Sequence, residues 1–455
     1  MTTLAAGVPE STLAMLLLDI AIVLLAGAAL GRFAQRLRQP AVVGEITAGI
    51  LLGPSVLGLL PGNLTQHLFP AEVRPLLSAV SQVGLILFMF VVGWEFEKRM
   101  IRPHAGLAAG VSLSSIAMAF GLGVALAPFL YPDHATVAGH EISFVAFATF
   151  LGTAMSVTAF PVLARILTEN KLMETRVGAL SLASAAIDDL LAWCLLAYVS
   201  ALVTSDGDFT NMAKIGLLSV GYIALMFLVV KPLVARLVWR WAATERWSAL
   251  LAVLCAGALG SAVLTTWIGI HAIFGAFLFG FVMPREPSRV LAQHLRKPMD
   301  NVSVVLLPVF FIVTGLGVDL GALSGGDFIA LALIIAVACA GKLVGAILPA
   351  RMAGLGWRES VDLGLLMNTR GLTELIILNA AVSLGVLDGR MFTMLVVMAL
   401  VTTAMAGPLL SRRTAKDAGA PLDGTKAPLD TELPAGAAPQ EARTTPGADV
   451  LTTHS

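Results

Sequence analysis

Charged residues are scarce in this 455-residue chain. Lysine, arginine, aspartate and glutamate make up 13% of the sequence and hydrophobic residues 57%, whereas a typical soluble domain is about 25% charged. This composition, with a mean hydropathy of +0.88, excludes an ordinary soluble protein and an intrinsically disordered one. The 29 basic and 29 acidic residues cancel, so the charge balance indicates no nucleic-acid partner.

Cysteines and nucleotide-binding motifs are equally sparse. The three cysteines, Cys194, Cys255 and Cys339, lie inside apolar stretches, which argues against a disulfide framework or a metal cluster. No glycine-rich fingerprint follows a strand and no P-loop occurs, so the sequence predicts neither a nucleotide site nor ATP drive. We therefore expect no cofactor.

Long apolar runs, in contrast, fill most of the chain. A helix needs about 20 apolar residues to cross the hydrocarbon core, and residues 1–411 contain thirteen candidate runs. Residues 412–455 are rich in Ala, Pro, Gly and Thr and are predicted to form a disordered cytoplasmic tail. The sequence thus predicts an all-α polytopic membrane protein with these transmembrane helices: 12–31, 40–60, 76–94, 104–129, 142–166, 177–203, 211–238, 248–266, 268–283, 300–318, 327–349, 360–384 and 391–411.

Basic residues alternate between the two sides of the predicted bundle. Loops after odd-numbered spans are basic, as with Arg32, Arg36 and Arg38, whereas loops after even-numbered spans carry little more than Arg74 and Arg390. The positive-inside rule then places the amino terminus outside the cell membrane and the carboxyl terminus in the cytoplasm. The alternation requires an odd number of spans, with the eighth and ninth spans separate.

A weak internal repeat relates the third span to the tenth. FMFVVGWEFE (88–97) aligns with FFIVTGLGVD (310–319), so that Gly93 matches Gly315. An offset of seven spans gives the two copies opposite orientations, which is typical of secondary transporters; chance similarity between Phe- and Val-rich helices is the alternative. The offset predicts two inverted halves of six helices and a linking span: about 12–203, 248–411 and 211–238.

The same offset pairs the fifth span with the twelfth, and both contain helix breakers. The fifth holds SVTAFPVLARIL with Pro161 at mid-span, and the twelfth holds MNTRGLTELIIL with Gly371 near its centre. Broken helices leave backbone groups that lipid cannot satisfy, so they are tolerated where they line a cavity. We expect two broken helices at corresponding positions of the repeat.

Two adjacent aspartates, Asp188 and Asp189, lie near the centre of the sixth span in AAIDDLLAW. An ionisable group at this depth costs at least about 2.5 kcal/mol, which marks it as a functional candidate. Adjacent helical residues point about 100° apart, so one carboxylate can face a basic residue while the other faces a cavity. A carboxylate that holds either a proton or a monovalent cation makes the two compete, which suffices for exchange. A purely structural hydrogen-bonded pair is the alternative.

Other charges also fall inside predicted spans. Lys342 in the eleventh span needs a carboxylate partner if it is buried, although snorkelling to the interface is an alternative. Arg370 and Glu374 are spaced i, i+4 and are interpreted as a mainly structural pair. For Glu45 in the second span we favour a helix contact over a gating role. Asp19 lies nearer a span end, where it can be solvated.

Five strings together resemble the monovalent cation:proton antiporter-2 family, especially its plant-type cation/proton exchangers and bacterial sodium/proton antiporters. They cover nearly all of the membrane part, in the order found in the family. The strings are QPAVVGEITAGILLGPSVLG (39–58), SVTAFPVLARIL (156–167), AAIDDLLAW (185–193), LLPVFFIVTGLGVDL (306–320) and MNTRGLTELIILN (367–379).

This resemblance implies the sodium/proton antiporter fold, with two crossing broken helices in a mobile core domain and a dimerisation domain that makes a homodimer. It implies that Asp189 binds the transported monovalent cation or proton. Asp188 would form a salt bridge with Lys342 that is released on ion binding. Hydroxyl and backbone groups of the first break would help to coordinate the ion: Ser156, Val157 and Thr158.

The implied function is an alternating-access antiporter that exchanges protons for Na⁺ or K⁺ across the bilayer. Asp-Asp with a lysine is typical of electrogenic members that move two protons per cation, whereas plant-type exchangers usually carry Asn-Asp. Oxygen ligands serve both ions, so sodium and potassium remain alternatives. An intramembrane aspartyl protease is a rival because GLGVD (315–319) is close to the G-x-G-D motif of such proteases. It has one extra residue before Asp319. A cation channel is another rival, but the sequence contains no selectivity-filter motif such as TVGYG.

Overall fold

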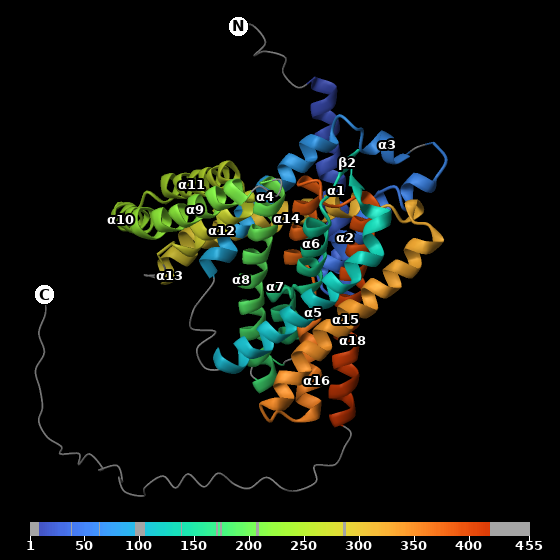
Figure 1. The fold of residues 1–455 in the computed structure, drawn as a ribbon. Helices are drawn as coiled ribbons and strands as arrows, with labels where there is room; N and C mark the ends of the chain where they lie inside the picture. The colour runs from blue at the N-terminus through green and yellow to red at the C-terminus, as the bar shows by residue number, and fades with distance from the viewer. Residues whose placement is uncertain are drawn as a thin grey trace, which may run out of the picture. The chain divides into compact units, whose positions relative to one another are not determined.

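The structure is a computed structural model that describes residues 9–418, except for 38, 63, 96–104, 138, 170–171, 173–174, 206–208 and 285–287. Long helices dominate this part of the chain (Figure 1). Ten of the described helical segments are long and apolar enough to cross a membrane. Some of them combine a helix with neighbouring helices or with short 3₁₀ or π turns, as when Met226–Val230 joins α9 to α10. Three shorter apolar helices, Phe144–Ser156, Ala272–Phe281 and Thr373–Ser383, fall in three further predicted spans.

The helices and the one hairpin among the described residues have the following bounds: α1 Glu10–Arg36, α2 Ala41–Leu52, α3 Leu64–Leu68, α4 Arg74–Glu95, α5 Ala105–His134, β1 Thr136–Val137, β2 His140–Glu141, α6 Phe144–Ser156, α7 Phe160–Glu169, α8 Arg176–Thr204, α9 Phe209–Leu225, α10 Lys231–Ala242, α11 Trp247–Ile268, α12 Ala272–Phe281, α13 Ser288–Leu291, α14 Lys297–Leu316, α15 Gly325–Met352, α16 Trp357–Met367, α17 Leu372–Ser383 and α18 Gly389–Ala418.

The two predicted helix breaks are present. The fifth predicted span consists of α6 and α7, separated by residues 157–159, and the twelfth consists of α16 and α17, separated by residues 368–371. Pro161 does not itself interrupt a helix, because it is the second residue of α7. A proline is tolerated there because the first amides of a helix have no helical acceptor. The break therefore lies just before the proline.

Two other boundaries bear on the predicted topology. α11 ends at Ile268 and α12 begins at Ala272, so the eighth and ninth predicted spans contain separate helices, as the charge alternation requires. α18 continues to Ala418, which carries it into the segment predicted as a tail. Residues 419–455, the rest of that segment, lie outside the described residues.

Helix packing follows the seven-span offset of the repeat. α4 packs on α12, and α14 packs on α2. The first pair consists of the third and ninth predicted spans and the second pair of the tenth and second, so corresponding helices are seven spans apart. Both matched glycines permit these contacts: a Cβ on Gly93 would lie 2.1 Å from the Phe277 carbonyl oxygen, and one on Gly315 would lie 2.4 Å from that of Ile46. Small residues at such positions let helix backbones approach closely.

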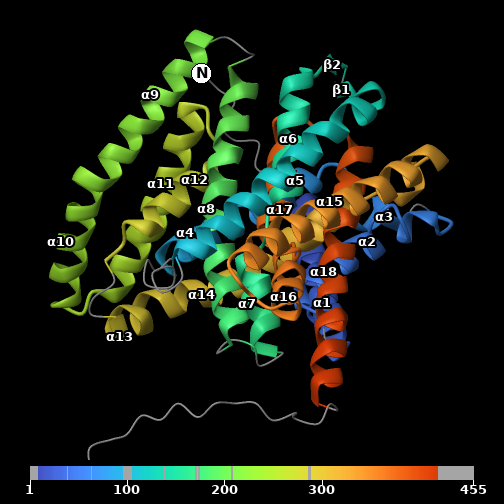
Figure 2. The same ribbon diagram turned by 60° about the horizontal axis from the view of Figure 1, so that its bottom comes forward.

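The helices form two groups that both views separate. The yellow-green helices α9 to α12 lie on one side, and α5, α15, α16 and α18 lie on the other (Figures 1 and 2). Within the second group α5 packs along α15, and α8 contacts α5, α6, α7 and α16. This packing brings the middle of α8, with its two aspartates, beside both helix breaks.

Candidate functional site

The two broken helices touch each other at their breaks. The backbone amide of Ala159 donates a hydrogen bond to the carbonyl of Thr369 (3.1 Å). The hydroxyl of Thr158 lies 2.8 Å from the carbonyl oxygen of Met367. Each break thus satisfies backbone groups of the other, which is how non-helical backbone is tolerated at membrane depth.

Arg370 compensates the carboxyl-terminal end of α6. Its guanidinium is fully buried and donates to the carbonyls of Ala154 (2.9 Å) and Met155 (2.7 Å). Because a helix carries partial negative charge at this end, the cation is well placed there. Glu374, also fully buried, lies 3.2 Å from the same guanidinium. The structure therefore brings the expected i, i+4 pair together and also joins it to the other broken helix.

Asp188 is enclosed by donors. The Lys342 ammonium lies 2.8 Å from Asp188 Oδ2, and both side chains have no exposed area. Thr158 Oγ1 lies 2.7 Å from the same oxygen and accepts a hydrogen bond from Lys342 (2.8 Å). The Ser112 hydroxyl donates to Asp188 Oδ1. Lys342 does not snorkel, and its contact with Asp188 is the one expected from the family resemblance.

Asp189 has a sparser environment. The Thr373 hydroxyl donates to Asp189 Oδ1 (3.1 Å), and the Phe160 backbone amide forms a second hydrogen bond. Both donors belong to the first turns of half-helices, α17 and α7, whose amino-terminal ends carry partial positive charge. Asp189 is 8% exposed whereas Asp188 is 0% exposed. Of the two aspartates, Asp189 is the less tightly enclosed.

The three residues expected to coordinate an ion in the first break have different positions. The Ser156 hydroxyl donates to the Thr153 carbonyl (2.8 Å) within α6. Val157 follows the last residue of α6 and is buried. Thr158 contacts Asp188 and Lys342, and none of its hydrogen bonds involves Asp189.

Glu45 lies on α2, half-buried against α1. A Cβ on Gly31 would lie 3.6 Å from Glu45 Oε1, and one on Gly27 would lie 3.9 Å from its Cγ. The side chain therefore follows the small-residue face of α1. This position agrees with a helix contact between α1 and α2.

The expectation that Asp19 is solvated is wrong. Asp19 is 0% exposed, and neither of its carboxylate oxygens has a hydrogen-bond partner among the described residues. The reason is tertiary packing, because α1 lies against both α2 and α14. Distance from the end of a predicted span does not reveal that cover.

Two residues at the site carry no signal strong enough to find them in the sequence. Ser112 is one of several serines in VSLSS, and Thr373 lies inside the string MNTRGLTELIILN without standing out. A hydroxyl in a membrane helix usually bonds to its own helix. Only the crossing of the breaks and the packing of α5 on α8 show which hydroxyls reach the aspartates.

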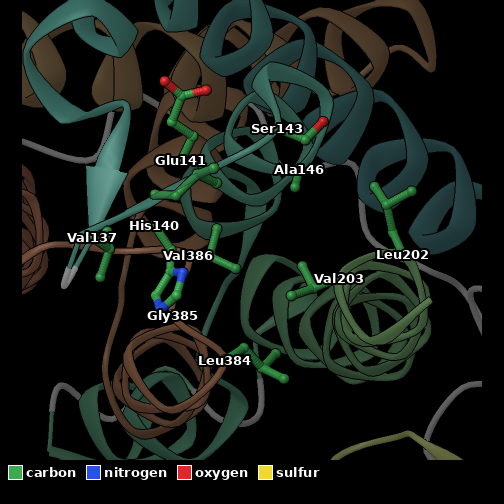
Figure 3. Close-up of a pocket in the computed structure, with 11 residues that line it drawn as sticks. Val137, His140, Glu141, Ser143, Ala146, Leu202, Val203, Leu384, Gly385 and Val386 are labelled. Atoms are coloured by element: carbon green, nitrogen blue, oxygen red, sulfur yellow. The ribbon is translucent and has the colours of Figure 1, made fainter. Parts of the chain in front are cut away.

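A cavity of about 370 Å³ lies at the far ends of the helices that form the site. Figure 3 shows His140 and Glu141 of β2 on one side of it and Leu202 and Val203 of α8 on the other. At 1.5 Å per residue, Val203 lies about 20 Å along α8 from Asp189. The cavity is therefore not lined by Asp188 or Asp189.

No group of three or more metal-ligating side chains occurs among the described residues. The residues at the breaks offer oxygen ligands and buried charge instead: two cations, Lys342 and Arg370, and three carboxylates, Asp188, Asp189 and Glu374. When all five are ionised, one negative charge is unbalanced. A single proton or monovalent cation neutralises it.

Two crossing broken helices beside buried carboxylates, in a chain with an inverted repeat, define a secondary active transporter. The chain belongs to the sodium/hydrogen exchanger family, whose transmembrane family model matches residues 20–416. This is a family of transporters and not of enzymes.

Individual relatives agree with this assignment. The chain is 40% identical over 405 residues to the Na⁺/H⁺ antiporter NhaS4 of Synechocystis, which covers 88% of this chain and 97% of the relative. It is 36% identical over 380 residues to K⁺/H⁺ antiporter 1 of Saccharomyces cerevisiae, covering 82% and 43%. Cation/H⁺ antiporter 20 of Arabidopsis thaliana is 36% identical over 441 residues, covering 91% and 51%. The chain thus spans about half the length of these plant and yeast relatives.

A solved structure shows the same fold. The sodium proton antiporter MjNhaP1 from Methanocaldococcus jannaschii superimposes with a TM-score of 0.65 at 12% sequence identity, over 89% of this chain and 97% of that chain. The similarity of fold extends over most of both chains.

Proposed function

We propose that this protein is an antiporter that exchanges protons for Na⁺ or K⁺ across the cell membrane by alternating access. The unbalanced negative charge of the cluster at the breaks carries this proposal. A site that needs one positive charge can hold a proton or a monovalent cation but not both, so each ion displaces the other. Relatives named as Na⁺/H⁺ and K⁺/H⁺ antiporters support both ions.

Asp189 is the group on which the two ions compete. It is slightly less buried than Asp188 and has two donors among the described residues, whereas the charge of Asp188 is already neutralised by Lys342. The positive ends of α7 and α17 stabilise the ionised carboxylate between occupancies. Ser156, Val157 and Thr158 would support the ion through the first break, as the family resemblance implies.

Electrogenic exchange needs a second proton carrier, and we assign that role to Lys342. A cation bound at Asp189 draws Asp188 away from the ammonium. A buried lysine without a carboxylate partner gives up its proton. Two protons then move for each cation. The cation-bound cluster, with neutral Lys342, keeps one net negative charge that the proton-bound cluster lacks, so one charge crosses the membrane per cycle. Arg370 and Glu374 hold the two broken helices together throughout.

The arrangement in the membrane is part of the same proposal. By the positive-inside rule, the basic loops support an amino terminus outside and a carboxyl terminus in the cytoplasm. A mobile core with the broken helices would move against a dimerisation domain within a homodimer. The two inverted halves, about 12–203 and 248–411, would provide the two access states.

The experiment is cation-driven proton movement in proteoliposomes. The variant Asp189→Asn removes the charge with little change of shape and is expected to abolish exchange with both Na⁺ and K⁺. Asp133→Asn, which alters an exposed carboxylate at the end of α5, is the matched control and is expected to keep normal exchange. Exchange that survives in Asp189→Asn would overturn the proposal.

The same assay separates the two rival functions. A channel would pass cations without a pH gradient, whereas an antiporter couples the two fluxes strictly. An aspartyl protease would need Asp319 as a catalyst. Asp319 instead caps the helical turn that follows it, by accepting hydrogen bonds from the amides of Gly321 (3.0 Å) and Ala322 (3.2 Å).

A further inference from the structure

The hydroxyl of Thr373 is the one side-chain group that hydrogen-bonds Asp189 among the described residues. It lies 3.1 Å from Asp189 Oδ1 and is 3% exposed. Thr373 belongs to the second broken helix, in the first turn of α17, whereas the expected ion ligands belong to the first. The hydroxyl is therefore an additional oxygen beside the carboxylate, from the opposite side of the crossing.

The position of Thr373 at a helix start explains why its hydroxyl is available. Several buried threonines within the long helices donate to their own helix, as Thr402 does to the carbonyl of Met398 (2.9 Å). Thr373 has no helical carbonyl behind it. The preceding carbonyls are engaged elsewhere: that of Thr369 accepts from an amide of the first break, and that of Arg370 accepts from a threonine of α18.

The other hydroxyl at the crossing is committed to a different task. Thr158 lies within 2.8 Å of Asp188 Oδ2, Lys342 Nζ and the Met367 carbonyl oxygen. Its oxygen accepts a hydrogen bond from the Lys342 ammonium, and its single hydrogen can be donated to Asp188 Oδ2 or to the Met367 carbonyl. Thr158 therefore belongs with the salt bridge, which leaves Thr373 as the hydroxyl of the Asp189 side.

We propose that Thr373 is a ligand of the exchanged cation and helps to set which monovalent cation the site prefers. This inference rests on the proposed role of Asp189. A hydroxyl has one donor and two acceptor lone pairs. It can donate to Asp189 while its lone pairs point to the cation, because hard cations take hydroxyl and carboxylate oxygens alike. Thr373 belongs to the second broken helix, whereas the other expected ligands belong to the first. The distance between the two breaks then affects which cation size the site prefers.

The test uses three threonine variants in proteoliposomes with Li⁺, Na⁺ and K⁺ as separate substrates. Thr373→Val keeps the shape and removes the hydroxyl, Thr373→Ser keeps the hydroxyl, and Thr402→Val is the control for a buried hydroxyl outside the site. We expect Thr373→Val to raise the half-saturating concentration of the preferred cation about tenfold, the size of a lost bond to a charged group. The three cations should be affected unequally. Thr373→Ser and Thr402→Val should stay within about twofold of the parent protein.

Two results would overturn the ligand role. One is a half-saturating concentration in Thr373→Val that is unchanged for all three cations. The other is a shift by the same factor for all three, because a residue that only positions Asp189 does not distinguish cations by size. Thr373→Ala, which also lacks the hydroxyl, carries the same comparison if the valine variant does not fold. Loss of exchange in Asp189→Asn together with an unchanged Thr373→Val rejects Thr373 alone and leaves the antiporter proposal standing.

Discussion

Asp188 and Asp189 are neighbours in one helix, yet their surroundings differ in almost every physical respect. Asp188 has no exposed area and is bound by an ammonium and two hydroxyls from three other segments. Asp189 is 8% exposed and is bound by one hydroxyl and one amide at half-helix starts. While it is paired with Lys342, Asp188 has little to offer an ion. The comparison teaches that the helical twist of about 100° between adjacent residues gives two neighbouring carboxylates different environments, which supports the proposed division into a salt-bridged and an ion-binding carboxylate.

The largest effect on stability is expected when the ion pair of Asp188 and Lys342 loses one of its members. Lys342→Met or Asp188→Asn leaves one buried charge without its counterion, which is expected to lower the free energy of unfolding by about 3–5 kcal/mol. The double variant Asp188→Asn/Lys342→Met removes both charges and should recover much of this loss. Thermal unfolding in detergent measures all three.

Two results would contradict that expectation. Unfolding temperatures of the single variants that equal the parent value would show that the pair is not buried as described. A double variant less stable than both single variants would show that the two charges act independently. Stable forms of Lys342→Met are also expected to carry no transport current, because the second proton carrier is gone.

A smaller effect is expected at the joint between the broken helices. Arg370→Lys keeps the positive charge and loses the fork that reaches the carbonyls of Ala154 and Met155 together. Lysine offers a single ammonium, so one charge-assisted hydrogen bond is lost, worth about 1.5–3 kcal/mol. Chemical unfolding in detergent measures this loss.

The control for Arg370→Lys is Arg296→Lys, which affects an exposed arginine paired with Asp300 at 4.0 Å. An exposed pair of this kind contributes about 1 kcal/mol at most. Equal losses in the two variants would sink the claim that Arg370 joins the broken helices through its fork.

The smallest effect concerns a polar cluster far from the aspartates. Burial would raise the pKa of Asp388, but hydrogen bonds from His134 (2.8 Å) and the Met391 amide (2.7 Å), with the charge of Arg390, lower it below the usual value. Asp327, which also contacts Arg390, is the other acidic group of the cluster.

Because the pKa of Asp388 is lower in the folded protein, its ionised form stabilises the fold above about pH 4, the value in the unfolded chain. That contribution is lost as the pH falls through the folded pKa. Asp388→Asn should therefore cost about 1–2 kcal/mol at pH 7, with the difference from the parent vanishing in strong acid. Thermal unfolding between pH 3 and pH 7 gives the difference. A loss that grows toward acid would have the wrong sign.

Much of the fold and part of the site could be predicted from the sequence. The hydropathy runs, the basic loops and the repeat around Gly93 and Gly315 depend on local composition, which the sequence displays directly. The contact between Asp188 and Lys342 was implied by the family resemblance, whereas burial alone indicated only that Lys342 needs a carboxylate partner. Pro161 pointed to the right break but lies in the first turn of the second half-helix, α7, instead of interrupting a helix.

The rest depended on tertiary packing. Ser112 and Thr373 reach the aspartates only because α5 packs on α8 and because the two breaks cross. Asp19 was expected in water but is covered by neighbouring helices. The direction of a hydroxyl and the cover over a carboxylate are set by segments far apart in the chain. Periodicity along one helix carries no information on either.

The central claim is that a proton and a monovalent cation compete for Asp189. The most direct test adds NaCl or KCl to the purified, weakly buffered protein and measures the protons released. The account predicts that the parent protein releases protons on cation binding, that the half-saturating cation concentration rises as the pH falls, and that Asp189→Asn releases none. Proton release by Asp189→Asn equal to that of the parent, or cation binding by the parent that is independent of pH, would contradict it.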